Sequence, residues 1–154
     1  METTTGQRPT IVVGVDGSSA SRAALAWATE EAELRGARLH AVQAWERPVG
    51  ALPLTHWSRA YFDGEVRREL SSTLENVIRD HPSIDLRTSV TEGDPVNVLV
   101  ETAEAEHADM LVLGRHGRRN LTSFFFGSVS KRCLANAHCA VAVVRPFDTE
   151  ESDV

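Results

Sequence analysis

The stretch MLVLGRHGRRNLTSFFFGSVS, residues 110–130, determines how the rest of the chain is interpreted. It opens with an apolar run that is typical of a buried strand. Gly114 and Gly117 follow this run, and Gly127-Ser128-Val129-Ser130 ends the stretch. Glycines let backbone N–H groups approach an anion closely, and a helix start adds unpaired N–H groups and the positive end of its dipole. The stretch therefore predicts a phosphate-binding site between a strand and a helix.

Two common phosphate-binding motifs do not account for this stretch. A Walker loop is excluded because no Gly-Lys-Ser/Thr follows the glycines at the required spacing. A dinucleotide-binding motif is excluded because no G-x-G-x-x-G follows the first apolar strand. The stretch also carries Arg115, Arg118 and Arg119, which can bind phosphates or remain solvated. The run Phe124–Phe126 can pack under the loop or form part of a partner surface.

The spacing of the glycines resembles the ATP-binding motif of the universal stress protein family. The motif is carried here by Gly114, Gly117, Gly127 and Ser128. The similarity extends from about Thr10 to Pro146 and includes the segments IVVGVDGS, EGDP, ADMLVLG and HCAVAVVRP. This resemblance implies ATP as the ligand, with Mg²⁺ accompanying the nucleotide.

Strand and helix patterns alternate along the chain. Apolar runs predict strands at residues 10–15, 38–45, 85–91, 110–113 and 140–144, and helical periodicity predicts helices at 18–35, 58–80, 95–107 and from about 127. Alternation without a hairpin signal predicts an α/β fold with a parallel sheet covered on both faces. The resemblance adds a doubly wound, Rossmann-like sheet of five strands in the order 3-2-1-4-5, which places Asp16 beside Gly114. Residues 10–146 would form this domain, with a disordered tail at 1–9 and an acidic tail at 147–154.

The resemblance also assigns roles to single residues near the strand ends. A carboxylate at Asp16 would hold Mg²⁺ or hydrogen-bond the sugar or base, and capping of the next helix is the alternative. Val15 and Val42 match positions whose backbone meets adenine in the family, although a strand valine can also be simply core. The residues expected to contact the nucleotide are Val15, Asp16, Val42, Leu113, Gly114, Gly117, Gly127, Ser128, Val129 and Ser130.

Length, charge and composition limit the number of domains, the kinds of partner and the location that we expect. A length of 154 residues indicates one domain, and a formal charge of −6 argues against bulk binding to nucleic acid. No apolar run approaches the roughly eighteen residues of a membrane span, and the first residues lack an apolar signal core, so we expect a cytoplasmic protein. Cys133 and Cys139 do not form a C-x-x-C pair, which favours two small buried side chains over a redox switch.

The last apolar strand is expected at an edge of the sheet. An exposed apolar edge strand is a template for pairing with another chain. Members of the family dimerise through this strand, so the resemblance implies a homodimer through Ala140, Val141, Ala142, Val143 and Val144.

The sequence shows a phosphate cradle but no recognisable nucleophile–base pair. Phosphoryl transfer also needs an acceptor or water held in line, so we expect at most slow ATP hydrolysis. The sequence therefore favours a nucleotide-dependent regulator in a stress response. Three alternatives remain, namely a module for another adenine nucleotide such as cyclic AMP, a protein-interaction dimer with a vestigial pocket, and a true hydrolase.

Overall fold

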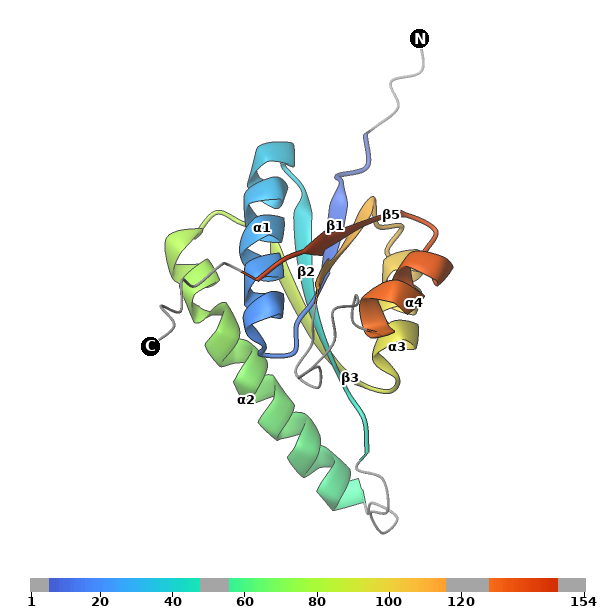
Figure 1. Cartoon of the computed structure of the whole chain (residues 1–154). Helices are drawn as coiled ribbons and strands as arrows, with labels where there is room; N and C mark the ends of the chain where they lie inside the picture. Colours follow the sequence, from blue (N-terminus) through green and yellow to red (C-terminus); the bar gives the residue numbers. More distant parts are fainter. Residues whose placement is uncertain (1–5, 48–55, 116–127, 147–154) are drawn as a thin grey trace, which may run out of the picture.

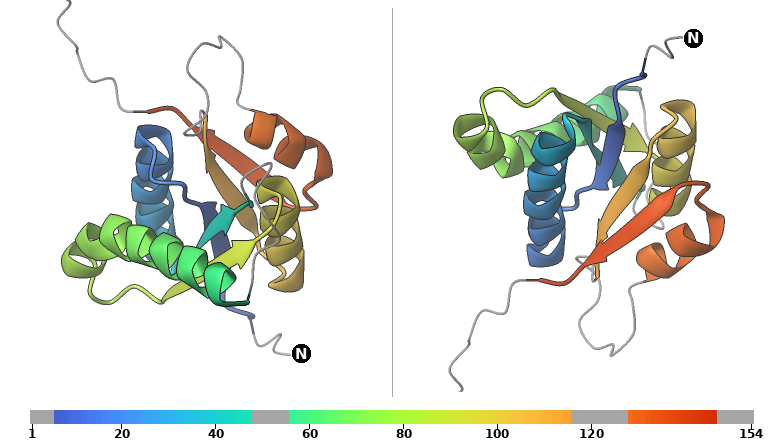
Figure 2. Two further views of the ribbon diagram at one scale, coloured as in Figure 1. Left: turned by 90° about the horizontal axis from the view of Figure 1, so that it is seen from below. Right: turned by 90° about the horizontal axis from the view of Figure 1, so that it is seen from above.

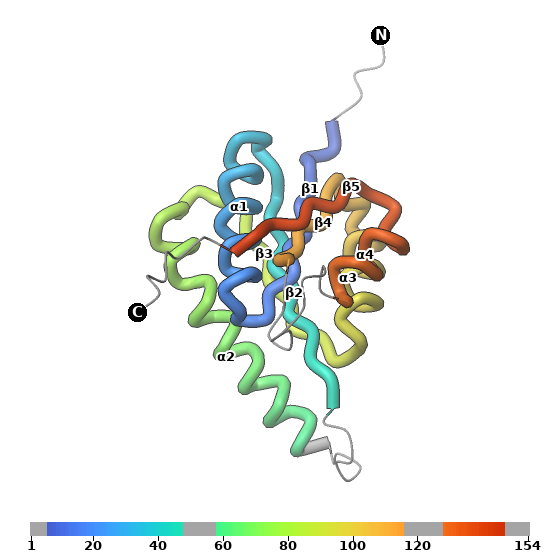
Figure 3. Tube along the Cα trace, viewed as in Figure 1, coloured from blue at the N-terminus to red at the C-terminus, as the bar shows by residue number. Residues whose placement is uncertain are grey.

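The computed structural model describes residues 6–47, 56–115 and 128–146, in which strands and helices alternate (Figures 1 and 3). The elements are β1 (Thr10–Gly14), α1 (Ser19–Arg35), β2 (Arg38–Trp45), α2 (His56–Asp80), β3 (Leu86–Glu92), α3 (Pro95–Ala105), β4 (Met110–Gly114), α4 (Ser128–Asn136) and β5 (Ala140–Val144). The predicted elements are confirmed, with boundaries that differ by one or two residues.

All strand pairs are parallel, and the strand order is β3-β2-β1-β4-β5. The predicted order is therefore confirmed, with β3 and β5 at the two edges. Helices α1 and α2 cover one face of the sheet, and α3 and α4 cover the other (Figure 2). The domain is a three-layer α/β structure, as the alternation predicts.

Each face of the sheet has its own hydrophobic core, because successive strand residues point to opposite faces. Val13 of β1 packs with Leu39 and Leu74 in the core beneath α1 and α2. Val12, its neighbour in the chain, packs with Leu111 and Cys133 in the core beneath α3 and α4. All six side chains are at most 1% exposed, so β1 is buried on both faces as its continuous apolar run predicts.

Local signals in the sequence set the helix ends. Ser18 caps α1, since its Oγ accepts a hydrogen bond from the Ser21 N–H at 3.2 Å. Gly36 ends α1 in the left-handed conformation with φ 61°, which glycine adopts without a steric penalty. Asp94 caps α3 and Pro95 occupies its first turn, positions that favour these residue types.

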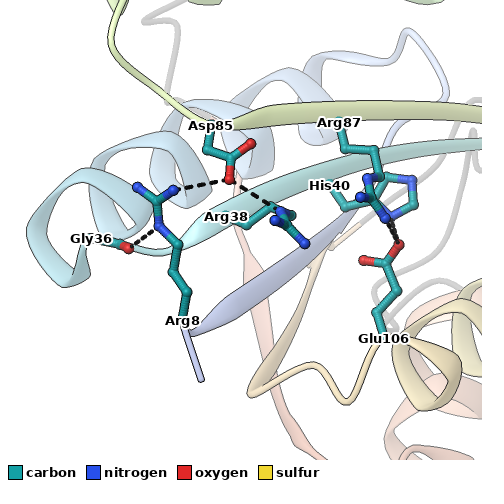
Figure 4. A network of polar contacts seen from close by, with 7 residues as sticks. All are labelled: Arg8, Gly36, Arg38, His40, Asp85, Arg87 and Glu106. Carbon is teal, nitrogen blue, oxygen red and sulfur yellow. Dashed lines mark hydrogen bonds and ion pairs between the residues drawn. The ribbon is translucent and has the colours of Figure 1, made fainter. Parts of the chain in front are cut away.

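Two expectations differ from the structure. The periodicity of α4 predicts Leu134 on the buried stripe, but Leu134 is 49% exposed because Cys133 is the residue of this turn that faces the core. The predicted N-terminal tail includes Arg8 and Pro9, yet both residues form hydrogen bonds with the domain. Arg8 Nε donates to the Gly36 carbonyl at 2.8 Å and Nη1 pairs with Asp85 Oδ2 at 3.0 Å (Figure 4), while the Pro9 carbonyl accepts from the Arg38 N–H at 2.8 Å. Residues 1–5 and 147–154 lie outside the described residues.

Candidate functional site

The candidate site lies at the carboxyl ends of β1 and β4, where the chain leaves the sheet in opposite directions. The two strands are adjacent and parallel, with Val13 paired to Val112. After β1 the chain enters α1 on one face, and after β4 the next described element is α4 on the other face (Figure 2). In doubly wound sheets this switch point opens a crevice for ligands.

Gly114 allows the end of β4 to pack directly on the first turn of α1. A Cβ atom placed on Gly114 would lie 2.6 Å from the carbonyl carbon of Ala20 and 2.7 Å from its oxygen. Real Cβ atoms do not approach backbone atoms so closely. The absence of a side chain at this position therefore sets how close β4 and α1 can lie.

Ser130 ties the first turn of α4 to the same strand end. Its Oγ donates a hydrogen bond to the Gly114 carbonyl at 2.8 Å, and the residue is only 3% exposed. Val129 is half-buried, whereas Ser128 is exposed at the start of the helix. The first backbone N–H groups of a helix have no hydrogen-bond partner within the helix. The hydrogen bond from Ser130 therefore holds these N–H donors of α4 close to Gly114.

Replacing Ser130 with alanine is expected to lower the free energy of unfolding by about 1–2 kcal/mol, because the Gly114 carbonyl loses its hydrogen bond. Urea denaturation measures this change. The matched control is Ser128→Ala, which alters an exposed side chain and should change the stability by less than about 0.5 kcal/mol. Equal losses in the two variants would contradict the structural role of the Ser130 hydroxyl.

Asp16 lies in the turn between β1 and α1. Its Oδ1 accepts a hydrogen bond from the Ser18 N–H at 2.9 Å, and its own N–H donates to Ser21 Oγ at 3.3 Å. The side chain is half-buried. Asp16 thus orders the turn before the helix, while the cap itself is Ser18. The turn holds the carboxylate of Asp16 at the carboxyl end of the sheet, where Gly114 also lies.

Val15, Val42 and Leu113 contribute their side chains to the core. They are 4%, 1% and 3% exposed. The Val15 N–H donates to the Val42 carbonyl at 2.9 Å, so the backbone at the end of β1 is joined to β2. Any ligand contact at these positions would have to be made by the backbone.

Eight of the ten predicted site residues lie within the described part of the chain, near the ends of β1 and β4 or at the start of α4. The other two lie outside it. Those two are Gly117 and Gly127; Arg118, Arg119 and Phe124–Phe126 lie outside it too. The backbone N–H of Arg115 donates to the Val144 carbonyl at 2.8 Å, which joins the chain after β4 to β5.

No local sequence pattern predicts a contact that links α3 to α4 near the carboxyl ends of the strands. Asp94 Oδ1 accepts from the Asn97 N–H at 3.1 Å, and Oδ2 pairs with Arg132 Nη1 at 3.3 Å. The Asn97 N–H, and then the Arg132 guanidinium, lower the pKa of Asp94 below its ordinary value of 3.8. Local patterns predict the cap, but the partner is thirty-eight residues away in the sequence.

The lowered pKa of Asp94 makes the free energy of unfolding depend on pH in the acidic range. Because the pKa is lower in the folded chain than in the unfolded chain, the carboxylate stabilises the fold above pH 3.8 and loses this contribution as the pH falls through the lowered value. Asp94→Asn keeps a capping oxygen but removes the charge. We expect it to cost about 0.5 kcal/mol at neutral pH and to remove this component from a stability–pH curve measured by urea denaturation. A stability–pH curve of Asp94→Asn that falls at acidic pH as much as that of the original chain would contradict this prediction.

The described residues contain neither a metal-binding cluster nor a membrane-spanning helix. Within residues 6–47, 56–115 and 128–146, no group of three or more His, Cys, Asp or Glu side chains could hold a metal ion. In the same ranges, no helix is long and apolar enough to cross a membrane.

A sequence model of the universal stress protein family matches residues 8–145. The chain belongs to this family. A universal stress protein of Methanocaldococcus jannaschii is 32% identical over 138 residues, which are 88% of this chain and 81% of that protein. One of Mycolicibacterium smegmatis is 35% identical over 138 residues, covering 88% of this chain but 45% of the relative. This universal stress protein therefore spans about half the length of its mycobacterial relative.

Solved universal stress proteins have the same fold. One in complex with cAMP superimposes with a TM-score of 0.70 at 24% identity, covering 90% of this chain and 97% of that one. One from Archaeoglobus fulgidus in complex with dAMP has a TM-score of 0.64 at 23% identity, covering 90% and 98%. These similarities confirm the doubly wound architecture of this universal stress protein.

Proposed function

We propose that this universal stress protein binds ATP at the carboxyl ends of β1 and β4 and acts as a nucleotide-dependent regulator in a stress response. The observation that carries the proposal is the contact of Gly114 with Ala20, next to the hydrogen bond from Ser130 to Gly114. Together these contacts place the starts of two helices on either side of one strand end. Solved relatives in complex with cAMP and dAMP support an adenine nucleotide as the ligand.

Each part of the nucleotide would meet a different part of the site. The triphosphate would bind the N–H groups at the start of α4 and the exposed hydroxyl of Ser128. Mg²⁺ would bind phosphate oxygens and the carboxylate of Asp16, since this ion is commonly held by one or two carboxylates together with substrate phosphates. The adenine would lie along the backbone at Val15 and Val42.

ATP is preferred over a nucleotide with one phosphate because of the residues that follow the glycine pair. In the sequence, Gly127 and Ser128 follow Gly117 after nine intervening residues. Helix α4 begins at Ser128, and a helix start suits additional phosphates. Binding would act by favouring one arrangement of the residues between β4 and α4, which changes the surface that a partner meets. An adenine nucleotide such as cyclic AMP is the alternative ligand.

Thermal unfolding with nucleotides tests the proposal. At a hundredfold excess over its Kd, ATP should stabilise the chain by about 2.7 kcal/mol, and Gly117→Ala or Gly127→Val should remove this shift. Cyclic AMP should compete for the same site and bind more weakly. A chain that millimolar ATP leaves unchanged would contradict the proposal, and tighter binding of cyclic AMP would favour the alternative.

We further propose that the protein is a homodimer in the cytoplasm. Strand β5 lies at an edge of the sheet, and four of its five residues are half-buried valines and alanines. Pairing of β5 with the same strand of a second chain would give its edge-facing backbone N–H and C=O groups hydrogen-bond partners. Light scattering should then give twice the chain mass of 16.9 kDa, and the mass of a single chain would contradict the dimer.

A further inference from the structure

A serine, a histidine and a glutamate meet on the α3 face of the sheet. His40 lies in β2, Ser89 in β3, and Glu106 caps the end of α3. His40 Nε2 is 2.9 Å from Ser89 Oγ, and His40 Nδ1 is 2.7 Å from Glu106 Oε1. Figure 4 shows His40 and Glu106 facing each other, with Arg87 beside them. We call Ser89, His40 and Glu106 the serine–histidine–glutamate cluster.

We propose that this cluster is a nucleophile–base–acid relay that hydrolyses short carboxylic esters, with Ser89 as the nucleophile. The cluster is separate from the candidate nucleotide site. His40 is the third residue of β2 and pairs with Val12 and Arg87, so it lies toward the amino ends of the strands. The nucleotide site lies at their carboxyl ends.

The order of the contacts is the one that such a relay requires. One ring nitrogen must face the nucleophilic hydroxyl, and a carboxylate must face the other nitrogen. His40 has Ser89 on Nε2 and Glu106 on Nδ1. The contact to Glu106 is at ion-pair distance without hydrogen-bond alignment, and such contacts in ligand-free sites often tighten only when substrate binds.

The burial of the cluster argues for a chemical role. His40 is 4% exposed, and the carboxylate of Glu106 lies against its Nδ1. Among the described residues, neither His40 Nδ1 nor Glu106 Oε2 has a hydrogen-bond partner, although both atoms are buried. A cluster that served only to hold α3 on the sheet would be expected to satisfy such atoms.

Access and charge also suit an ester substrate. Ser89 is half-buried on β3, which is an edge strand of the sheet. Arg87 precedes it by two positions and therefore projects from the same face of β3. Its Nη1 is 3.3 Å from Glu106 Oε1, and its side chain is 54% exposed. This guanidinium is placed to stabilise the negative oxygen that forms when the ester carbonyl is attacked.

The reaction is balanced without a further reactant except water. Ser89 Oγ attacks the carbonyl carbon while its proton passes to His40 Nε2. The bond from carbon to the alcohol oxygen breaks, and His40 returns the proton to the leaving alcohol. Water then attacks the acyl–serine ester, giving up a proton to His40, and the carboxylic acid leaves as Ser89 regains its hydrogen. No atom is oxidised or reduced.

Labelling of the full chain with a fluorophosphonate, followed by peptide mass mapping, tests the relay. We expect the adduct on Ser89, and a labelling rate that falls about a hundredfold in His40→Gln. Glu106→Gln should slow labelling and change its pH profile. The burst of p-nitrophenol from p-nitrophenyl acetate should disappear in Ser89→Ala.

The chain offers a matched control. His81 Nδ1 is also 2.7 Å from a glutamate oxygen, that of Glu33, but among residues 6–47, 56–115 and 128–146 no serine contacts its other nitrogen. Ser83 is an exposed serine two residues beyond His81. His81→Gln and Ser83→Ala should therefore leave labelling and turnover unchanged. Absence of an adduct on Ser89, or equal ester turnover by the chain and by Ser89→Ala, would overturn the proposal. Melting curves establish that each variant is folded, and the Ser89→Ala comparison decides the outcome if His40→Gln is not.

Discussion

Replacing Gly114 with alanine is expected to lower the free energy of unfolding by about 3 kcal/mol, the upper end of the typical cost of overpacking a packed interior. The new Cβ atom would lie 2.6 Å and 2.7 Å from the carbonyl atoms of Ala20. These are backbone atoms, which cannot rotate away as a side chain can, so α1 must shift against β4. Calorimetry should show a melting temperature lower by about 6–12 °C, and ATP should no longer stabilise the chain.

A second glycine provides a control of opposite sign. Gly64 lies within α2, and the nearest atom to an added Cβ is Arg68 Nη2 at 3.9 Å. Gly64→Ala should therefore raise the free energy of unfolding by about 0.5–1 kcal/mol, because alanine loses less conformational freedom in a helix. It should leave ATP binding unchanged. A Gly114→Ala protein as stable as the original chain would show that β4 and α1 are not in tight contact.

The thiol of Cys133 is expected to react with iodoacetamide at least about a hundredfold more slowly than an ordinary cysteine. Burial raises its pKa from the ordinary 9.0 to about 11, partly offset by the nearby Arg132. The reactive thiolate is then about a hundredfold scarcer at pH 8. The side chain is also fully buried, so the reagent must wait for the chain to open. Peptide mapping of alkylated samples measures the rate.

Cys139 is the internal comparison for this rate. It is half-buried, and burial raises its pKa as well, so it should react slowly but faster than Cys133. In concentrated urea both thiols should react at the same rate. Labelling of Cys133 in the native chain at its urea rate would contradict the prediction and reopen the redox-switch interpretation of this pair.

The architecture was predictable because its determinants are local in the sequence. The continuous apolar run of β1 indicates a strand buried on both faces, and the alternating pattern of β3 indicates an edge. Gly36 and the Asp94-Pro95 pair mark helix ends through their backbone preferences alone. The strand order needed the family resemblance, because alternation does not determine it.

The contacts that shape the candidate site could not be predicted in the same way. The packing of Gly114 on Ala20 and the pairing of Asp94 with Arg132 join residues far apart in the sequence. No local pattern indicates which glycine is required by close packing. The periodicity of α4 predicts a buried Leu134, but the residue is exposed. A short helix allows two overlapping apolar stripes, and only packing determines which of them is buried.

The serine–histidine–glutamate cluster shows the same limit for chemistry. The sequence contains no recognisable nucleophile–base pair, because Ser89 and His40 are forty-nine residues apart and meet only through the pairing of β2 with β3. Glu106 joins them from the end of a helix that crosses the sheet. Strand register, which a single sequence does not reveal, brings the three side chains together.

The most direct measurement is a crystal structure of the chain grown with excess ATP and Mg²⁺. We predict the triphosphate on the N–H groups between β4 and α4, close to Gly114 and Ser128, with the metal ion near Asp16 and the adenine along Val15 and Val42. A structure in which this place is filled by the protein's own arginines or phenylalanines, or in which ATP binds elsewhere, would contradict a nucleotide site at the ends of β1 and β4.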